Sequence, residues 1–199
     1  MNNIHSEVTR AFSYKEYVSL IRSLLSENKT TGSNQGSELI EFTKLNLSRM
    51  EKWNKIGELI PEWNQLTSVK PQTWWLLTEA WCGDASQIVP FIAKIADRFP
   101  EIELKLILRD ENTSIMNRYL TDGAWAIPKL IAVEYAHDTE KELFVWGPRP
   151  KKAQDIVLEW KKTPGGERKE ELYEKNHAWY ASDKGTNIQQ ELFVELSSL

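Results

Sequence analysis

Thr78-Glu79-Ala80-Trp81-Cys82-Gly83-Asp84-Ala85 is the stretch around which the rest of this 199-residue sequence is organised. An apolar run at 73–77 precedes it, and an amphipathic run at 87–99 follows it. We therefore expect a strand, a tight glycine-containing turn and a helix, with Cys82 at the helix N-terminus. There, the helix dipole and the unpaired N–H groups favour the thiolate over the thiol. Cys82 is the only cysteine, so any thiol chemistry must use it.

Hydrophobic periodicity predicts the elements on either side of this turn. The helix after it carries an inward stripe with helical spacing at Ile88, Phe91, Ile92, Ile95, Ala96 and Phe99. The strand before it is apolar on both faces, which is typical of a central strand covered by helices. The predicted order is strand 73–78, helix 86–99, strand 102–108, helix 112–120, hairpin strands 129–134 and 142–146, and helix 151–162.

This order and three short motifs resemble the thioredoxin family. Trp-Cys-Gly at 81–83 resembles the family's active site, whose usual form is Trp-Cys-Gly-Pro-Cys. Pro90 stands where thioredoxins carry a proline that kinks the helix, and Ile127-Pro128 resembles the cis-proline that faces the active-site cysteine. The resemblance covers residues 70–162 and implies an α/β fold of the thioredoxin-like three-layer α/β/α type. Its centre is a mixed four-stranded sheet, and helical extensions are added at both ends.

Two departures from the family pattern limit the chemistry that the resemblance implies. Ala85 stands where the family has its second, resolving cysteine, and alanine cannot attack a mixed disulfide. Leu76 stands where thioredoxins keep a buried aspartate that serves proton transfer during resolution. Either Cys82 works as a monothiol, or the site no longer carries out redox chemistry.

The resemblance implies a catalytic Cys82 and substrate-binding residues around it at Trp81, Gly83, Asp84, Ile127 and Pro128. A cis bond before Pro128 would present the backbone groups of Ile127 to an extended peptide. The negative charge of Asp84, with that of Glu79, disfavours a second negative charge on sulfur. We therefore expect a less acidic thiol than in a strongly activated oxidoreductase, although an exposed and reactive one. As a simpler role, Asp84 is a residue that favours the helix start.

The flanking regions predict helices that pack on this core. We divide the chain into an N-terminal helical extension at 1–69, the thioredoxin-like domain at 70–162 and a C-terminal helical extension at 163–199. In the first, a helix at 12–27 begins with a capping box of Ser13 and Glu16, and a second helix spans 38–57. Pro61 opens a further short helix. A break at 163–166 precedes the C-terminal helices, which either dock on the core or mediate dimer contact, so the protein is a monomer or a homodimer.

Composition and charge restrict the partners. A net charge of -4 argues against general binding to nucleic acid or to a membrane surface. A single cysteine and no long apolar run lead us to expect a cytoplasmic protein. The histidines His5, His137 and His177 lack metal-ligand spacing, and we expect no metal and no cofactor. We interpret Arg149 and the charged turn at 109–112 as solvated.

Three hypotheses about function remain. The first is a monothiol thiol-disulfide oxidoreductase, in which Cys82 forms a mixed disulfide with a protein disulfide or a low-molecular-weight thiol. An external thiol then resolves that disulfide. The alternative is a redox-inactive module that recognises a protein partner through the Cys82/Pro128 groove. The third is a carrier in which Cys82 and an external thiol ligate a metal or an iron–sulfur centre.

Overall fold

A four-stranded sheet forms the centre of the computed structural model, which describes residues 3–136, 139–162 and 168–199. The strands lie in the order β2-β1-β3-β4, and β1 pairs parallel with β2 and antiparallel with β3. The mixed sheet of the thioredoxin-like fold is thus confirmed. The strands are β1 (Gln72–Thr78), β2 (Ile102–Leu108), β3 (Lys129–Ala136) and β4 (Thr139–Trp146).

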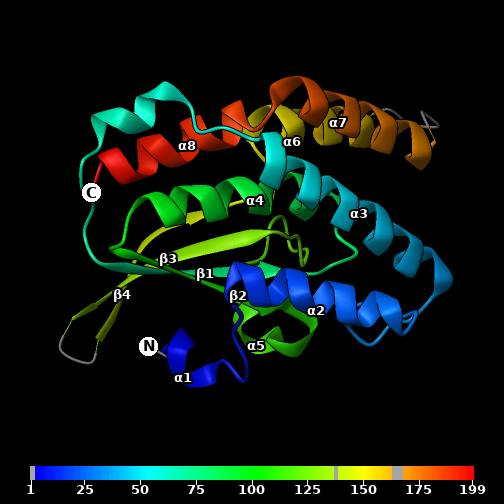
Figure 1. The fold of residues 1–199 in the computed structure, drawn as a ribbon, viewed down its shortest axis with the longest axis horizontal. Coiled ribbons are helices and arrows are strands. Elements are labelled where there is room, and N and C mark those ends of the chain that lie inside the picture. Colours follow the sequence, from blue (N-terminus) through cyan, green and yellow to red (C-terminus); the bar gives the residue numbers. More distant parts are fainter. Residues whose placement is uncertain (1–2, 137–138, 163–167) are drawn as a thin grey trace.

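β1 is the central strand, and all seven of its residues are buried. Its neighbours are in register on both sides, so that Leu76 lies opposite Leu106 of β2 and Leu130 of β3. Helices cover both faces of the sheet (Figure 1). The apolar run before the Cys82 turn is therefore explained by burial on two faces.

Helix α4 (Gly83–Arg98) follows β1 and lies against the sheet (Figure 1). It begins three residues before the predicted start at Ser86, and Cys82 is its N-cap residue. The predicted inward stripe is buried, and Pro90 lies inside the helix. The chain thus turns at Cys82 soon after β1 ends, which places the thiol beyond the C-terminal end of the central strand.

The N-terminal region supplies α1 (Ile4–Glu7), α2 (Tyr14–Ser26), α3 (Ser37–Ile56) and the short 3-10 helix η1 (Pro61–Gln65). The predicted capping box is confirmed, because the Ser13 side chain accepts from the Glu16 N–H and the Glu16 carboxylate accepts from the Ser13 N–H. Phe12 exchanges backbone hydrogen bonds with Leu106. This bridge occupies the outer edge of β2.

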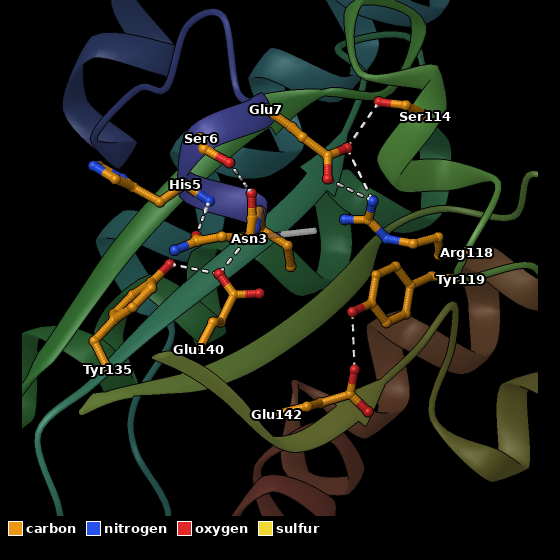
Figure 2. A network of polar contacts seen from close by, with 11 residues as sticks. Asn3, His5, Ser6, Glu7, Ser114, Arg118, Tyr119, Tyr135, Glu140 and Glu142 are labelled. Atoms are coloured by element: carbon orange, nitrogen blue, oxygen red, sulfur yellow. Dashed lines mark hydrogen bonds and ion pairs between the residues drawn. The ribbon is translucent and has the colours of Figure 1, made fainter. Parts of the chain in front are cut away.

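The four-residue helix α1, which we did not predict, is held by long-range polar contacts (Figure 2). The Ile4 N–H donates to Glu140 Oε2 at 2.9 Å, and Tyr135 donates to the same oxygen. Arg118 pairs with Glu7 at 2.7 Å. A helix this short needs such tertiary contacts, because its own hydrogen bonds do not offset the cost of nucleation.

The predicted helix at 112–120 is wrong in length. The chain forms the 3-10 turn η2 (Arg109–Glu111) and then only one turn of helix, α5 (Thr113–Met116). Beyond α5, the N–H groups of Arg118 and Tyr119 donate three residues back rather than four. Tyr119 and Leu120 keep helical spacing with Ile115 and Met116, but Tyr119 is only partly buried and Leu120 is 41% exposed. This part of the chain therefore has little tertiary packing to stabilise a longer helix.

The C-terminal helices are α6 (Lys151–Lys162), α7 (Lys169–Asp183) and α8 (Thr186–Ser197). Figure 1 shows them on the same side of the sheet as α4. The tail therefore docks on the core, one of the two possibilities left open. The two hairpin strands are longer than predicted, since β3 extends to Ala136 and β4 begins at Thr139. Residues 137–138 of the predicted hairpin loop at 136–141 and the predicted break at 163–166 lie outside the described residues. Among the helices of the described ranges, none has the length and apolar character that crossing a membrane requires.

Candidate functional site

Cys82 lies between the end of β1 and the first turn of α4. Its N–H donates to the Glu79 carbonyl at 3.1 Å, and its carbonyl accepts from the Ser86 N–H at 3.2 Å. These bonds close the turn and hold Cys82 at the C-terminal end of β1. The Cys82 thiol donates to the Ile127 carbonyl oxygen at 3.4 Å. The structure thus brings Cys82 and Ile127 together, 45 positions apart in the chain.

The expectation of an exposed thiol is wrong, because Cys82 is only 8% exposed. Burial raises the pKa of the thiol to about 12, and the charge of Asp84 adds to the rise. The backbone N–H groups of Ala85 and Asp84 and the charge of Arg149 act in the opposite direction without cancelling it. Burial therefore raises the pKa of the thiol by more than the helix N-terminus lowers it, and Cys82 is a neutral hydrogen-bond donor at neutral pH.

Ile127 and Pro128 are both buried beside Cys82, and the peptide bond between them is cis, as the resemblance implies. The chain segment at 147 packs directly against Pro128. Gly147 has a φ of +111°, and a Cβ there would lie 2.4 Å from the Pro128 carbonyl oxygen. Only glycine fits this contact.

The two positions that depart from the family pattern are both apolar and buried. Leu76 is fully buried in the centre of β1, and Ala85 is 3% exposed in the first turn of α4. No ionisable group therefore replaces the family's aspartate or resolving cysteine at these two positions. The thiol has no neighbour there that could accept its proton or attack a mixed disulfide.

Asp84 is more than a residue at a helix start, since its carboxylate joins three parts of the chain. Arg149 pairs with Oδ2 at 2.6 Å, while Asn176 and Tyr180 of α7 donate to Oδ1 at 3.0 and 2.9 Å. The interpretation of Arg149 as solvated is therefore wrong. Burial lowers the Arg149 pKa, but the charge and hydrogen bond of Asp84 outweigh it and raise the pKa above its ordinary value.

Helix α7 also covers Gly83. A Cβ at Gly83 would lie 3.2 Å from His177 Cε1, and Arg49 of α3 approaches the same position. Burial, followed by the charge of Arg49, lowers the pKa of His177 to about 4, against the opposing charge of Asp84. His177 is therefore neutral at physiological pH. Helix α7 thus packs over Gly83 and Asp84, the two residues that follow Cys82.

Beside the Cys82 turn, Arg109 lies close to two tryptophans. Its guanidinium is 4.8 Å from the Trp81 ring centre and 5.9 Å from that of Trp125. Arg109 also pairs with Asp110 at 2.7 Å. The turn at 109–112 is therefore not simply a solvated charged turn, because Arg109 is held over aromatic rings and Asn112 is buried. Trp125, 39% exposed, is the accessible part of this stack.

Glu79 is fully buried beneath the same turn. Its Oε1 accepts from the Asp110 N–H at 2.9 Å. Burial raises the pKa of Glu79 to about 7, and the charge of Asp110 also raises it, while hydrogen bonds from Thr31 and Asp110 and the charge of Arg109 oppose the rise. Glu79 faces this cluster, and the nearby negative charge that raises the pKa of Cys82 is that of Asp84.

Reasoning from the sequence missed the α7 side of the site. Asn176 and Tyr180 stand 92 and 96 positions from Asp84. No local spacing connects residues so far apart. A weak signal existed, because Asn176, His177 and Tyr180 place polar groups on one face of a predicted helix. Within the described ranges, no three His, Cys, Asp or Glu side chains are grouped so as to hold a metal ion.

The arrangement of β1, the Cys82 turn, α4 and the cis-proline strand can now be compared with known proteins. A sequence model described as Thioredoxin matches residues 32–163. The chain belongs to the thioredoxin family. The match begins well inside the predicted N-terminal extension, and the division at 69/70 and 162/163 remains a prediction. No curated protein matches the sequence.

Two solved structures share the fold. One is an HIV epitope-scaffold, 14% identical, which covers 94% of this chain and 99% of its own with a TM-score of 0.56. The other is a protein of unknown function from Pseudomonas aeruginosa, 15% identical, which covers 94% of this chain and 98% of its own with a TM-score of 0.56. At these identities the likeness extends to the fold alone.

Proposed function

We propose that this chain is a redox-inactive member of the thioredoxin family that binds a protein partner. The observation that carries the proposal is the state of the Cys82 sulfur. It is buried, it donates to the Ile127 carbonyl, and its pKa is raised to about 12. Because the thiolate is the nucleophile in disulfide exchange, a protonated and covered thiol does not start the reaction.

The monothiol reaction is supported less well by this geometry. It requires that a disulfide approach Cys82 in line with the sulfur, and α7 covers the helix start from which it would come. It also requires a base or a charge that favours the thiolate, and the nearest carboxylate, Asp84, acts against ionisation. A protein disulfide or a low-molecular-weight thiol is therefore not the partner that we favour.

The rim of the site offers a surface for a protein. Trp81, Arg109 and Trp125 form a stack beside the buried Cys82/Pro128 face. Tryptophan and arginine are enriched among the residues that dominate protein interfaces. Of the residues predicted to bind substrate, Trp81 belongs to this rim. Gly83, Asp84, Ile127 and Pro128 lie beneath it or under α7.

The redox part of the proposal is tested by the alkylation rate of Cys82 against pH, in the native protein and in urea. We expect native rates far below those of the unfolded chain and no midpoint below about 8.5. Incubation with oxidised glutathione, followed by mass spectrometry, should find no mixed disulfide. A native midpoint well below that value, or a stable mixed disulfide, would overturn the proposal in favour of the monothiol reaction.

The binding part is tested by quantitative affinity capture under reducing conditions with three immobilised variants. Trp125→Ala should lose proteins that the wild type retains, whereas Cys82→Ser should retain them. Val194→Ala, on an exposed position of α8, is the matched control. Identical profiles for Trp125→Ala and wild type would remove the rim as the binding surface. Selective loss with Cys82→Ser would restore a role for the thiol.

A further inference from the structure

Helix α7 is attached to the active-site face through very few groups. Its buried residues are Leu172, Asn176 and Tyr180. Two of these three are polar, and both donate to the same oxygen of Asp84. The two hydrogen bonds from α7 to the start of α4 therefore meet at one carboxylate, while the Tyr180 ring belongs to the main apolar core and Trp179 packs against that core.

The polar groups around this contact are incompletely satisfied. Asn176 Oδ1, His177 Nδ1 and Arg149 Nε are buried and have no hydrogen-bond partner within the described part of the chain. Such groups lose their hydration without compensation, which disfavours the closed arrangement. If α7 moved away, water would reach the atoms of Asn176 and His177, which this helix itself carries. The hydrogen bonds to Asp84 thus stabilise the closed state, and the unpaired buried polar atoms destabilise it.

The following helix provides a fixed point for such a movement. Lys184 and Gly185, between α7 and α8, both have left-handed φ values of 52° and 77°. Gly185 sits tightly on Phe91 of α4, since a Cβ there would lie 2.4 Å from the ring. α8 continues into the main apolar core through Ile188, Leu192 and Leu196. A change in the backbone at 184 would therefore move α7 while α8 stays in place.

We propose that α7 is a displaceable lid over Cys82 and Gly83, and that Asp84 is its latch. In the closed state, Asn176 and Tyr180 hold the latch and His177 covers Gly83. In the open state, the face formed by Cys82 and Pro128 becomes continuous with the Trp81–Arg109–Trp125 rim and accepts the protein partner. The purpose of the lid rests on the proposed function, whereas its motion does not.

The motion is tested by hydrogen exchange of the wild-type protein without any partner. We expect the amides of 169–183 to exchange at least ten-fold faster than those of 186–197. Their exchange should also depend weakly on low concentrations of denaturant, as a local opening does. Exchange of both helices at one rate, with the denaturant dependence of global unfolding, would overturn the lid.

The latch is tested by the double variant Asn176→Ala/Tyr180→Phe, which leaves Cys82 and Asp84 intact. It should raise the alkylation rate of native Cys82 at least ten-fold and leave the exchange of α8 unchanged. Tyr173→Phe, an exposed tyrosine on the same helix, is the matched control and should have the wild-type rate. A wild-type rate in the double variant, or a rise explained by a lower global stability, would overturn the latch.

These readouts separate the lid from the proposed function, since neither requires a partner. A lid that opens in a protein whose Trp125→Ala variant loses no bound protein would leave the motion standing and remove its purpose. If α7 does not open in a protein that still binds its partner through Trp125, the proposed function stands and the lid is overturned.

Discussion

Helices α7 and α8 are neighbours in sequence and similar in length, yet they are attached to the protein in opposite ways. α8 places Ile188, Leu192 and Leu196 in the main apolar core. From α7 only Tyr180 belongs to that core, and its hydroxyl donates to Asp84, whereas the other two buried residues, Leu172 and Asn176, lie outside the core. Apolar burial is non-directional and tolerates small shifts, whereas a few hydrogen bonds to one carboxylate hold a helix only in one position. The difference distinguishes a helix held mainly by apolar packing from the helix that we propose to be a lid.

The buried side-chain amides of the two helices show the same contrast. Gln189 of α8 accepts from the Ile60 N–H and Trp63 Nε1 at 2.9 and 3.1 Å and donates to the Glu58 carbonyl at 3.0 Å. Asn176 of α7 donates to Asp84 but leaves its own oxygen without a partner in the described residues. A satisfied buried amide specifies a unique packing, and a half-satisfied one weakens it.

The largest expected effect comes from replacing one buried leucine of each helix by alanine. Leu192→Ala should lower the free energy of unfolding by about 2–5 kcal/mol, because it opens a cavity in the main core. Leu172→Ala should cost about 2 kcal/mol or less. Chemical denaturation measures both values, and hydrogen exchange should show α7 alone loosened in Leu172→Ala. Equal losses of global stability would remove the distinction between the helices.

Replacement of the two amides should have the next largest effect. Gln189→Leu leaves the Trp63 N–H and the Ile60 N–H without their acceptor and should cost about 1–3 kcal/mol of global stability. Asn176→Leu removes one donor together with an unpartnered acceptor, so its global cost should stay below about 1 kcal/mol. Exchange of α7 should nevertheless accelerate. A greater global loss for Asn176→Leu than for Gln189→Leu would contradict the comparison.

The effect of pH on the opening of α7 should be smaller than the effects of these substitutions. The pKa of His177 is lowered to about 4 in the folded protein, from an ordinary value of about 6.5. Its contribution to closure is therefore complete above pH 6.5 and is lost as pH falls toward 4, because only the open or unfolded form takes up the proton. Between pH 7 and 5, opening of α7 should increase several-fold after correction for intrinsic exchange.

His177→Gln, which does not titrate, is the control for this experiment and should abolish the pH dependence of α7 opening. Global stability is a poorer readout, because Glu79 acts in the opposite direction. Its pKa is raised to about 7, so its contribution is present below pH 4.5 and is lost as pH rises through 7. Glu79→Gln should consequently gain stability relative to wild type between pH 5 and 8. A flat difference would show that Glu79 keeps its ordinary pKa.

The smallest effects should come from exposed positions of the two helices. Val194 on α8 is 64% exposed, and Val194→Ser should change stability by no more than about 0.5 kcal/mol without affecting exchange. Tyr173 on α7 packs edge-on against Phe42 of α3. Tyr173→Ser should accelerate exchange of α7 slightly at unchanged global stability. Acceleration in α8 but not in α7 would reverse the expected order.

Much of the fold could be predicted because it follows from local patterns. The apolar run of β1, the stripe of α4 and the capping box at Ser13 are encoded within a few residues each, and all are present. The helix at 112–120 was predicted too long because its apolar spacing continues through Tyr119 and Leu120, but the tertiary structure leaves Tyr119 only partly buried and Leu120 exposed. The helix α1 was missed because contacts with Glu140 and Arg118, distant in sequence, hold it.

The candidate site was predicted only on its core side. Trp81, Cys82 and Pro128 lie near one another as the family resemblance implies, and the charge of Asp84 acts on the thiol in the predicted direction. The exposure of the thiol and the solvation of Arg149 were wrong. Both errors have one cause, which is that α7 and the turn at 149 close over the start of α4.

By itself, the sequence determined the thioredoxin-like framework, the single thiol and the loss of its resolving cysteine and aspartate, since these depend on which residue occupies which position. Only the tertiary structure decided whether that thiol is exposed. The pKa of Cys82 depends on how much of the sulfur is desolvated and on which charges lie nearby. Arg149 and Ile127 act on the sulfur from segments far away in the chain, and α7 binds the neighbouring Asp84 carboxylate.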